Sequence, residues 1–519
     1  MQQFRKTAAF VQAPLVIVIS VGVIAAFQSV TLVMSNVDQS IPFSVYFYGD
    51  TGHYLDHARA IADAGFHDAA PPFHPPGTAW FLAFWLTVLS PIPMRLLIMK
   101  GVFSVTFILT TMIAAHHAIR LNGPVAGWVT GGMCALSFGL AVLGTTFNAE
   151  TLYLLLLTAT LSGLSRKNPV SVRSAGVWGV LSGLAWLIRG EHGALIIIFA
   201  LICAGFPSRR EFRVHWRSGA VFLVMACAVV APWTLRNIRV ITAINRDVAR
   251  SRVPDDPLLL WVPVTFYGPL NCALANLPPA TGTFTREALP SSGGSHRLNL
   301  MDPTHRKLIV HGYAMGIGAW VRDPERAIVL IWNKWRLSLS GFSLGYSIRN
   351  WPGGMTGIRR PMDIFVPDIG WISHVHLIAG TAGFIGILHR NRRTGVLFLC
   401  SILHRMAIVS LFFGYARHGL LLWPITAVAI GTSVASVSRV GIRRSLIAIL
   451  VTAGMAALVV NGLDARTIRR LTVTFQTIPG SSEPDQQQTM RFTVLTEDDQ
   501  PGSLPEIEMR HAPGSDLLN

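Results

Sequence analysis

The residues best placed to do chemistry lie in a polar segment, 35–76, between the first and the second apolar stretch of the chain. This segment contains the run YGDTGHY at 48–54 and ends with HPPG at 74–77, where the sequence becomes apolar again. A carboxylate such as Asp50, just outside a membrane helix in a chain with few carboxylates, is costly unless it is used. We therefore expect the chemistry of this protein to be centred on this segment.

Other polar side chains stand at the ends of later apolar stretches. The residues singled out in this way are Asp50, His53, Tyr54, Asp56, His57, His74, Asn148, Glu150, Arg189, Glu191, His192, Trp233, Arg236, Asn237, Tyr415, Arg417 and His418. Ionisable groups at membrane depth are functional candidates, because each is costly unless it is paired or used. Since the topology derived below puts these residues on one side of the membrane, we expect them to converge on one cavity.

The residue types on this face indicate a reaction on a phosphorylated substrate held in the membrane. Arginines bind phosphate oxygens bidentately. A carboxylate can accept the proton of an attacking hydroxyl. An apolar groove between helices can hold a lipid tail, so a lipid-linked phosphate is the substrate that fits this set of groups.

The composition requires membrane helices to position these residues. The chain is 51% hydrophobic and 13% charged, with a mean hydropathy of +0.47, which a soluble protein with a charged surface does not need. Apolar runs of about 17 to 25 residues, the length of a spanning helix, recur along it. The sequence predicts an all-α polytopic membrane protein with spans at 10–34, 77–91, 95–116, 123–143, 149–165, 174–188, 193–206, 218–235, 369–388, 395–413, 419–437 and 444–462.

The net charge of +17 does not indicate a nucleic-acid partner, because the basic residues form short clusters between apolar runs. This is the positive-inside pattern of cytoplasmic loops. It puts the N-terminus inside, and 35–76, 237–368 and 415–418 outside. Twelve full crossings disagree with these sides by one crossing, so one short segment, 77–91 or 149–165, must not span the membrane fully. The five cysteines include no C-x-x-C, so neither a disulfide framework nor a thiolate metal site is expected.

Two units follow from this pass along the chain. Residues 1–462 form a transmembrane catalytic unit of about 11 to 13 spanning helices with two large outer loops, 35–76 and 237–368. Within the second loop, 327–342 is apolar on one side only and predicts a helix lying in the membrane interface. Residues 463–519 are a polar tail, expected to be flexible or docked on the outer face.

Seven short motifs in order resemble the GT-C superfamily of membrane glycosyltransferases. They are GDTGHYLDHARAIADAG at 49–65, FHPPG at 73–77, NAE at 148–150, GLAWLIR at 183–189, PWTLRN at 232–237, DP at 323–324 and RHGLLLWP at 417–424. The chain is similar in particular to the bacterial members that resemble dolichyl-phosphate-mannose protein mannosyltransferases, and to the aminoarabinose transferase of lipid A. The resemblance covers about residues 10 to 440, nearly the whole membrane part.

The resemblance implies roles for four residues, Asp50, Glu150, Arg236 and Arg417. Asp50 matches the family's catalytic acidic residue, which acts as general base on the acceptor hydroxyl. Together with polar residues that share the predicted outer face, the expected substrate-binding residues are His53, Tyr54, His74, Glu150, Arg189, Arg236, Arg417 and His418. Arg236 and Arg417 would face the lipid phosphate, and Glu150 the sugar or the acceptor. The chain departs from the family at Thr51, where Glu is more usual, and at His74, where lipid A-type members carry Glu-Lys.

These implications define the expected function and its rivals. The expected enzyme moves a single sugar from a polyprenyl-phosphate donor to a glycan, lipid or protein acceptor at the outer face of a bacterial inner membrane. One displacement at the anomeric carbon inverts its configuration. No cofactor is expected. The first rival is a polysaccharide polymerase or ligase that uses diphosphate-linked lipid donors, and the second is a flippase or transporter, although no internal repeat is visible.

Simpler interpretations of the same residues remain open at this point. Asp50 can cap the helix predicted to follow it. Asp50, His53 and His57 fall at i, i+3 and i+7, one helix face, and can hold a zinc ion. Arg189, Arg236 and Arg417 can be interfacial residues that extend toward water.

Overall fold

The chain is an all-α polytopic membrane protein. The computed structural model describes residues 2–35, 50–92, 94–165, 170–206, 209–250, 257–284, 289–291, 298–343 and 371–440, and three short stretches of the tail, 472–477, 490–495 and 507–509. The predicted span 444–462 and the first part of the outer loop, 36–49, lie outside the described residues. The expected total of 11 to 13 spans therefore stays a prediction.

Four described helices are long and apolar enough to cross a membrane: α1 (Gln2–Ser35), α4 (Arg95–Asn122), α10 (Arg209–Arg250) and α15 (Arg392–Leu411). Shorter apolar helices pack among them. These are α3 (Pro76–Val88), α7 (Ala149–Leu164), α8 (Val172–Ile188), α9 (Gly193–Cys203) and α17 (Trp423–Val440). At 13 residues, α3 is about 20 Å long, so the segment 77–91 is too short to span the hydrocarbon by itself.

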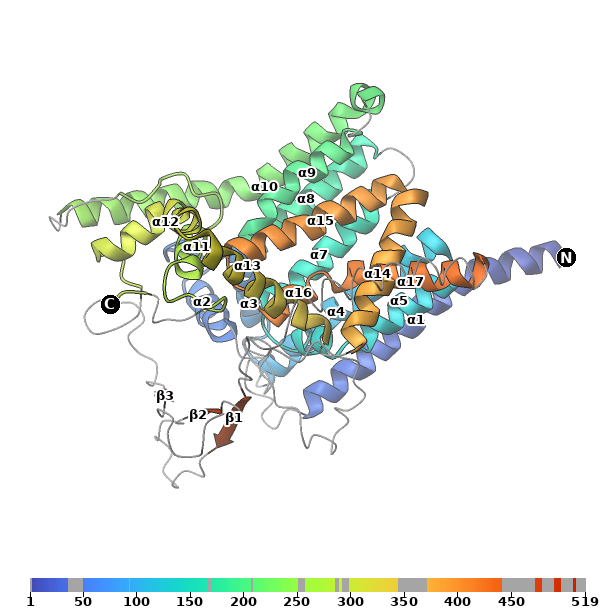
Figure 1. Cartoon of the computed structure of the whole chain (residues 1–519), viewed down its shortest axis with the longest axis horizontal. Coiled ribbons are helices and arrows are strands. Elements are labelled where there is room, and N and C mark those ends of the chain that lie inside the picture. Colours follow the sequence, from blue (N-terminus) through green and yellow to red (C-terminus); the bar gives the residue numbers. More distant parts are fainter. Residues whose placement is uncertain are drawn as a thin grey trace.

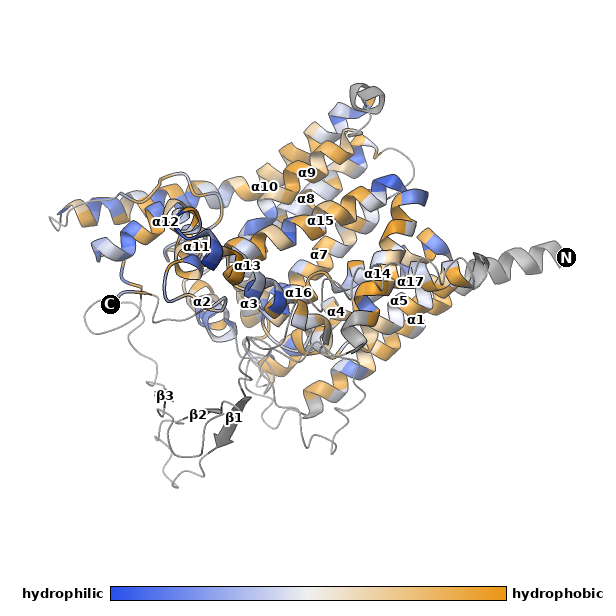
Figure 2. Cartoon of the chain, in the orientation of Figure 1, coloured by the Kyte–Doolittle hydropathy of each residue, from blue (hydrophilic) through white to orange (hydrophobic). Residues whose placement is uncertain are grey.

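Small residues let the helices of the bundle approach closely. α10 packs along α8 and α9 in Figure 1, and a Cβ atom on Gly179 or Gly183 of α8 would overlap a backbone carbonyl of α10. Such positions favour helix packing in membranes, where lipid tails remove the hydrophobic driving force between helices. The other main pairs are α14 (Trp371–Arg390) with α17, and α1 and α4 with α5 (Pro124–Ala135). Figure 2 shows these helices as largely apolar ribbons.

The predicted span 123–143 is interrupted. α5 ends at Ala135, and α6 (Phe138–Leu143) starts after Ser137, whose hydroxyl accepts a hydrogen bond from the Leu140 amide at 3.4 Å. Ser137 acts as a helix cap, which satisfies one of the free amides at the start of α6. The break brings the chain to Asn148, the cap of α7.

The segments predicted to lie outside are more helical than the sequence indicates. α10 continues past residue 237 to Arg250, and at 42 residues it is about 63 Å long, twice the thickness of the hydrocarbon. The outer loop 237–368 therefore begins inside a helix. It also contains α11 (Tyr267–Asn276), α12 (Pro303–Arg322) and α13 (Pro324–Leu339). Figure 1 shows α2 (Thr51–Asp63), α11, α12 and the end of α10 together at one end of the bundle.

The predicted interfacial helix 327–342 is present as α13, followed by the short 3-10 turn η3 (Ser340–Ser343). One face of α13 is buried against α15 and α16 (Ala416–Leu420). In the tail, β1 (Thr472–Thr477), β2 (Met490–Leu495) and β3 (Ile507–Met509) form an antiparallel sheet in the order β1-β2-β3. The sheet adds a small β element to the all-α membrane part; whether the tail docks on that part stays a prediction.

Candidate functional site

Asp50 stands directly before α2 but does not cap it. The residue has φ −84° and ψ 12°, and its side chain accepts no hydrogen bond from the amides of the first turn. Its Oδ2 atom instead lies 3.3 Å from Nη2 of Arg417, which donates to it, and 42% of the side chain remains exposed. The capping interpretation is therefore wrong, and the carboxylate is directed to an arginine far away in the sequence.

The charge state of Asp50 follows from its neighbours. Partial burial would raise the pKa of this carboxyl group, but the positive charge of Arg417, with smaller contributions from His74 and His53, outweighs burial and lowers the pKa below its usual range. Asp50 is thus ionised at neutral pH. An ionised, partly exposed carboxylate can accept a proton or a hydrogen bond from an incoming hydroxyl group.

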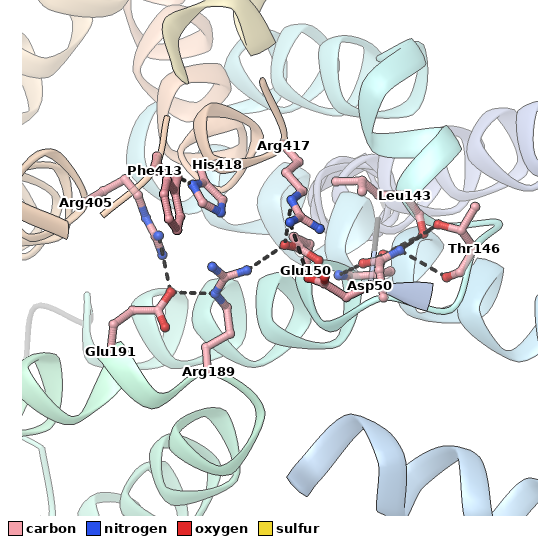
Figure 3. A network of polar contacts seen from close by, with 12 residues as sticks. Asp50, Leu143, Thr146, Glu150, Arg189, Glu191, Arg405, Phe413, Arg417 and His418 are labelled. Carbon is pink, nitrogen blue, oxygen red and sulfur yellow. Dashed lines mark hydrogen bonds and ion pairs between the residues drawn. The ribbon is translucent and has the colours of Figure 1, made fainter. Parts of the chain in front are cut away.

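Arg417 joins Asp50 to a second carboxylate, Glu150. The Nε atom of Arg417 lies 3.8 Å from Oε1 of Glu150, and the guanidinium lies 5.1 Å from the centre of the Tyr415 ring. Glu150 is in the first turn of α7, where Asn148 caps the helix by accepting from the Thr151 amide at 2.9 Å. Residues predicted to converge from three distant segments of the chain therefore meet at one guanidinium (Figure 3).

Further ion pairs extend from Glu150 into the bundle. Arg189 Nη1 donates to Glu150 at 2.7 Å, and its Nε donates to Glu191 at 2.6 Å. Arg405 Nη1 lies 3.3 Å from the same Glu191 oxygen. The result, visible in Figure 3, is a charge ladder of alternating sign, which we define as Asp50, Arg417, Glu150, Arg189, Glu191 and Arg405.

The charge ladder has three carboxylates and three guanidinium groups, so its formal charges cancel. The side chains of Arg405, Glu150 and Arg189 are only 3%, 5% and 12% exposed. Removing one member of such a buried set leaves an uncompensated charge, which costs about 3–5 kcal/mol. The ladder therefore holds its members in fixed positions, while the Asp50 end opens toward solvent.

Arg405 is a site residue that the sequence reasoning missed. It lies within α15, one of the four candidate spans, next to His404, whose Nε2 donates to the Glu191 carbonyl oxygen at 2.9 Å. The available signal was an arginine in the middle of an apolar stretch, which by itself marks a functional candidate. The selection of residues at the ends of helices excluded it.

His418 is adjacent to Arg417 and has a fixed tautomer. Its Nδ1 lies 3.0 Å from the Phe413 carbonyl oxygen, so this nitrogen carries the proton and donates. Burial, and then the positive charges of Arg189 and Arg417, lower the pKa of His418 well below its usual value. The ring is therefore neutral at pH 7, with a lone pair on Nε2.

The predicted residues His53, Tyr54 and His74 form an aromatic group beside Asp50. The His74 ring lies 6.0 Å from His53, stacked, and 5.6 Å from Tyr54, edge-on. Tyr267, at the start of α11, joins them at 5.3 Å from His74. Burial lowers the pKa of His74 although Asp50 opposes this shift, and burial raises the pKa of Tyr54. Flat rings next to a carboxylate can contact the faces of a sugar ring.

Arg236 does not join Arg417, in contrast to the expectation that both face a lipid phosphate. Its guanidinium donates to the Asp68 side chain at 2.9 Å, to the carbonyl oxygens of Asp68 and Ala70, and to Asn237, and it lies 4.4 Å from the Trp233 ring centre. These partners use its donors within the protein. Arg236 thus fastens the last part of the segment 35–76 to α10.

His57 belongs to this second cluster. Its Nε2 donates to Asp68 Oδ2 at 3.1 Å. Burial would raise the pKa of Asp68, but the bond from His57 and the charge of Arg236 lower it. Asp50, His53 and His57 therefore do not converge as the zinc alternative requires, and the described part of the chain contains no group of three or more His, Cys, Asp or Glu side chains placed to hold a metal ion.

Comparisons with known proteins give a distant structural likeness. Neither a protein-family model nor a curated protein matches the chain. The apo oligosaccharyltransferase of Archaeoglobus fulgidus is similar over 85% of this chain and 54% of its own, with 14% identity and a TM-score of 0.46. The archaeal oligosaccharyltransferase AglB from the same organism, in complex with an inhibitory peptide and a dolichol-phosphate, covers 85% and 54% with 12% identity and a TM-score of 0.44.

A third structure, of the same enzyme tethered to an acceptor peptide, has 12% identity and a TM-score of 0.46 over 85% of this chain. The chain spans about half the length of these solved structures. A likeness of this degree does not decide the activity, which has to be argued from the charge ladder and its surroundings.

Proposed function

We propose that this chain is a GT-C-type glycosyltransferase that moves one sugar from a polyprenyl-phosphate donor to an acceptor at the outer face of a bacterial inner membrane. The observation that carries the proposal is the state of Asp50. Its carboxylate does not cap α2. It is ionised, partly exposed and held by Arg417 at the exposed end of the buried charge ladder. A structural carboxylate needs none of this arrangement.

The reaction is a single displacement. The acceptor oxygen forms a bond to the anomeric carbon of the donor, and the bond from this carbon to the phosphate oxygen breaks, so the phosphate leaves with the electron pair. Asp50 accepts the proton of the acceptor hydroxyl and later releases it to water. Because attack comes from the side opposite the leaving phosphate, the anomeric configuration inverts.

Arg417 has two tasks in this scheme. It holds Asp50 and Glu150 in place through contacts of 3.3 and 3.8 Å, both long for charge-assisted bonds. Because these contacts are long, a phosphate oxygen can replace a carboxylate oxygen as the acceptor of one guanidinium N–H group. Positive charge at this point stabilises the phosphate as its negative charge grows in the transition state.

Arg189 and Glu150 orient Arg417 from the interior. Arg189 is bound at 2.7 Å to Glu150 and at 2.6 Å to Glu191, so short contacts already occupy it. We therefore assign Arg189 and Glu191 to holding the site together, and Arg417 to the phosphate. His53, Tyr54, His74 and His418 border the same region and are the residues proposed to contact the substrates.

The experiment that tests this function compares two donor classes. Membranes from cells with and without the gene are supplied with a labelled polyprenyl-phosphate sugar or with the corresponding diphosphate-linked sugar. The labelled envelope products are then identified by mass spectrometry. We expect label to move from the monophosphate donor only. Transfer from the diphosphate donor alone would favour the polymerase or ligase, and donor translocation without any product would favour a transporter.

A further inference from the structure

The segment that carries Arg417 and His418 rests on α13 through close backbone contacts. A Cβ atom on Gly414 would overlap the Lys334 carbonyl oxygen, and one on Gly419 would overlap the Ser338 carbonyl oxygen, both on α13. Likewise, a Cβ atom on Gly341 in η3 would overlap the Ala416 carbonyl oxygen of α16. Backbone packed this closely cannot move independently, so the position of α13 determines the position of Arg417.

Lys334 of α13 is fully buried and donates two hydrogen bonds to neighbouring elements. Its Nζ atom lies 2.7 Å from Oδ1 of Asn276 at the end of α11, and 2.9 Å from the Ser410 carbonyl oxygen in the last turn of α15. Carbonyls in the last turn of a helix lack partners within the helix and carry its negative dipole end, so a cation is stabilised there.

Asn276 has all four of its hydrogen-bonding positions filled. Its Oδ1 accepts from Lys334 and, at 2.8 Å, from Trp320 of α12. Its Nδ2 donates to the Cys272 carbonyl oxygen at 2.7 Å and to the Leu411 carbonyl oxygen at 2.8 Å. An amide can make no more bonds than these. We call Lys334, Asn276 and Trp320 the lysine hub, and it joins α11, α12 and α13 to the end of α15.

The end of α15 is close in sequence to the proposed reaction centre. Leu411 is the last residue of α15, and six residues later the chain reaches Arg417. The same helix carries Arg405, at the opposite end of the charge ladder. Arg405 therefore lies on α15 and Arg417 six residues beyond its end, and the lysine hub fixes the end of this helix.

We infer that Lys334 is a positioning residue for the proposed sugar transfer: by binding the last turn of α15 it directs Arg417 toward the donor phosphate, without touching substrate itself. The inference rests on the proposed function. Lys334 Nζ donates to Asn276 and to Ser410. Trp335 on the same helix donates to the Ser410 hydroxyl at 2.8 Å, so α13 binds the last turn of α15 at a second point.

The charge on Lys334 is sensitive to pH near neutrality. Burial lowers the pKa of Lys334 to about 7, and of the nearby groups Cys272 on α11 favours the charged form while Arg326 on α13 opposes it. The neutral amine still has two N–H donors for its two acceptors, so the geometry survives deprotonation. The ammonium form binds the α15 carbonyl more strongly because its hydrogen bond is charge-assisted.

The test is a double-mutant cycle measured on the full-length protein in membranes. Lys334→Met keeps the length of the side chain but removes its donors, and Lys307→Met, at an exposed position on α12, is the matched control. We expect Lys334→Met to raise the KM for a polyprenyl-phosphate sugar about tenfold while the acceptor KM stays within about twofold. Lys307→Met should change neither constant.

The decisive value is the combination of Lys334→Met with Arg417→Ala. If Lys334 acts through Arg417, the double variant has the donor KM of Arg417→Ala alone, because the hub no longer has a guanidinium to direct. A double variant whose donor KM is raised by the product of the two single effects would overturn the inference. An unchanged donor KM in Lys334→Met would also overturn it. The pH dependence of the donor KM near 7 should also disappear in Lys334→Met.

Trp320→Phe provides a second variant that keeps an aromatic side chain and removes the indole N–H that donates to Asn276. It should raise the donor KM in the same direction by a smaller factor, even if Lys334→Met does not fold; no change in either variant would overturn the inference. Failure of the proposed function itself has a different signature. In that case the wild-type protein transfers no sugar from this donor, whatever the hub does.

Discussion

At the scale of single residues, the proposed site depends on which neighbour neutralises which charge. Asp50 would be a weakly placed carboxylate without Arg417, and Glu150 would be a buried charge without Arg189. Since removing one partner from a buried pair is more costly than removing both, the ladder makes each member depend on the next. Asp50 has the most exposed side chain of the six, which fits its proposed contact with substrate.

The pKa of Asp50 gives a prediction about pH. Because the pKa is lowered, the ionised form is present from neutral pH down into the acid range, and activity falls only as the pH drops through the lowered pKa. In Arg417→Gln the largest charge that opposes burial is gone, so the pKa of Asp50 rises and the acid limb of kcat/KM moves to higher pH. A pH–rate profile measures this shift, with Arg59→Gln at an exposed position on α2 as control. An unmoved acid limb would contradict the assignment.

Arg236 gives a second prediction at this scale. Because its donors are bound to Asp68, Ala70 and Asn237, Arg236→Met should lower the free energy of unfolding by about 1–3 kcal/mol and leave the donor KM near its normal value. Thermal unfolding in detergent and donor titration measure the two quantities. The exposed Arg239→Met, three residues further along α10, is the control. A large rise in donor KM with unchanged stability would restore the phosphate role expected from sequence.

At the scale of elements, local signals account for part of the structure. The helix predicted to follow Asp50 is present as α2, and the polar start NAE at 148–150 correctly predicts α7, because Asn148 caps it. The break between α5 and α6 was missed, since the run 123–143 is apolar throughout and only Ser137 hints at a new helix start. The sequence does not predict that α10 continues past residue 237, because polar residues follow there, whereas the structure packs 258–264 along this part of the helix.

The close backbone contacts of the α13 region predict a response to added volume. Gly414→Ala places a methyl group against the backbone of Lys334, so the segment carrying Arg417 has to move, and we expect transfer activity to fall at least tenfold with helix content unchanged. Gly101→Ala on α4, where no atom lies within 4 Å of the added Cβ, should have no effect. Transfer assays and circular dichroism separate the two results; full activity in Gly414→Ala would show that the contact is unimportant.

At the scale of the whole molecule, the composition predicted the membrane class, while the convergence of distant residues required the fold. The sequence placed Asp50, Glu150, Arg189, Arg417 and His418 at helix ends, and the structure brings these residues together. The sequence alone does not separate Arg236 from this group, because the pairing of Arg236 with Asp68 depends on how the loop 64–72 folds back onto α10. Arg405 was hidden for the opposite reason, since it lies inside an apolar stretch.

The predicted orientation can be measured on whole cells. In a cysteine-free background, a cysteine at exposed Asp56 on α2 should react with a membrane-impermeant maleimide in intact spheroplasts, and one at exposed Arg173 at the start of α8 should react only after permeabilisation. These outcomes follow if the basic clusters are cytoplasmic. The reverse labelling pattern would place the Asp50 site on the cytoplasmic side and remove the outer-face assignment.

The central claim is tested most directly by Asp50→Asn, compared with Asp56→Asn, in proteoliposomes with a labelled polyprenyl-phosphate sugar. Asp56 is exposed on α2, the helix that follows Asp50, and pairs only weakly with Arg59, at 3.3 Å. The measured quantity is the rate of transfer at saturating donor, together with donor binding. We predict that Asp50→Asn loses about 10²-fold or more of the rate while it still binds donor, because the proton acceptor is gone, and that Asp56→Asn keeps the normal rate. A normal rate in a folded Asp50→Asn protein would contradict the account.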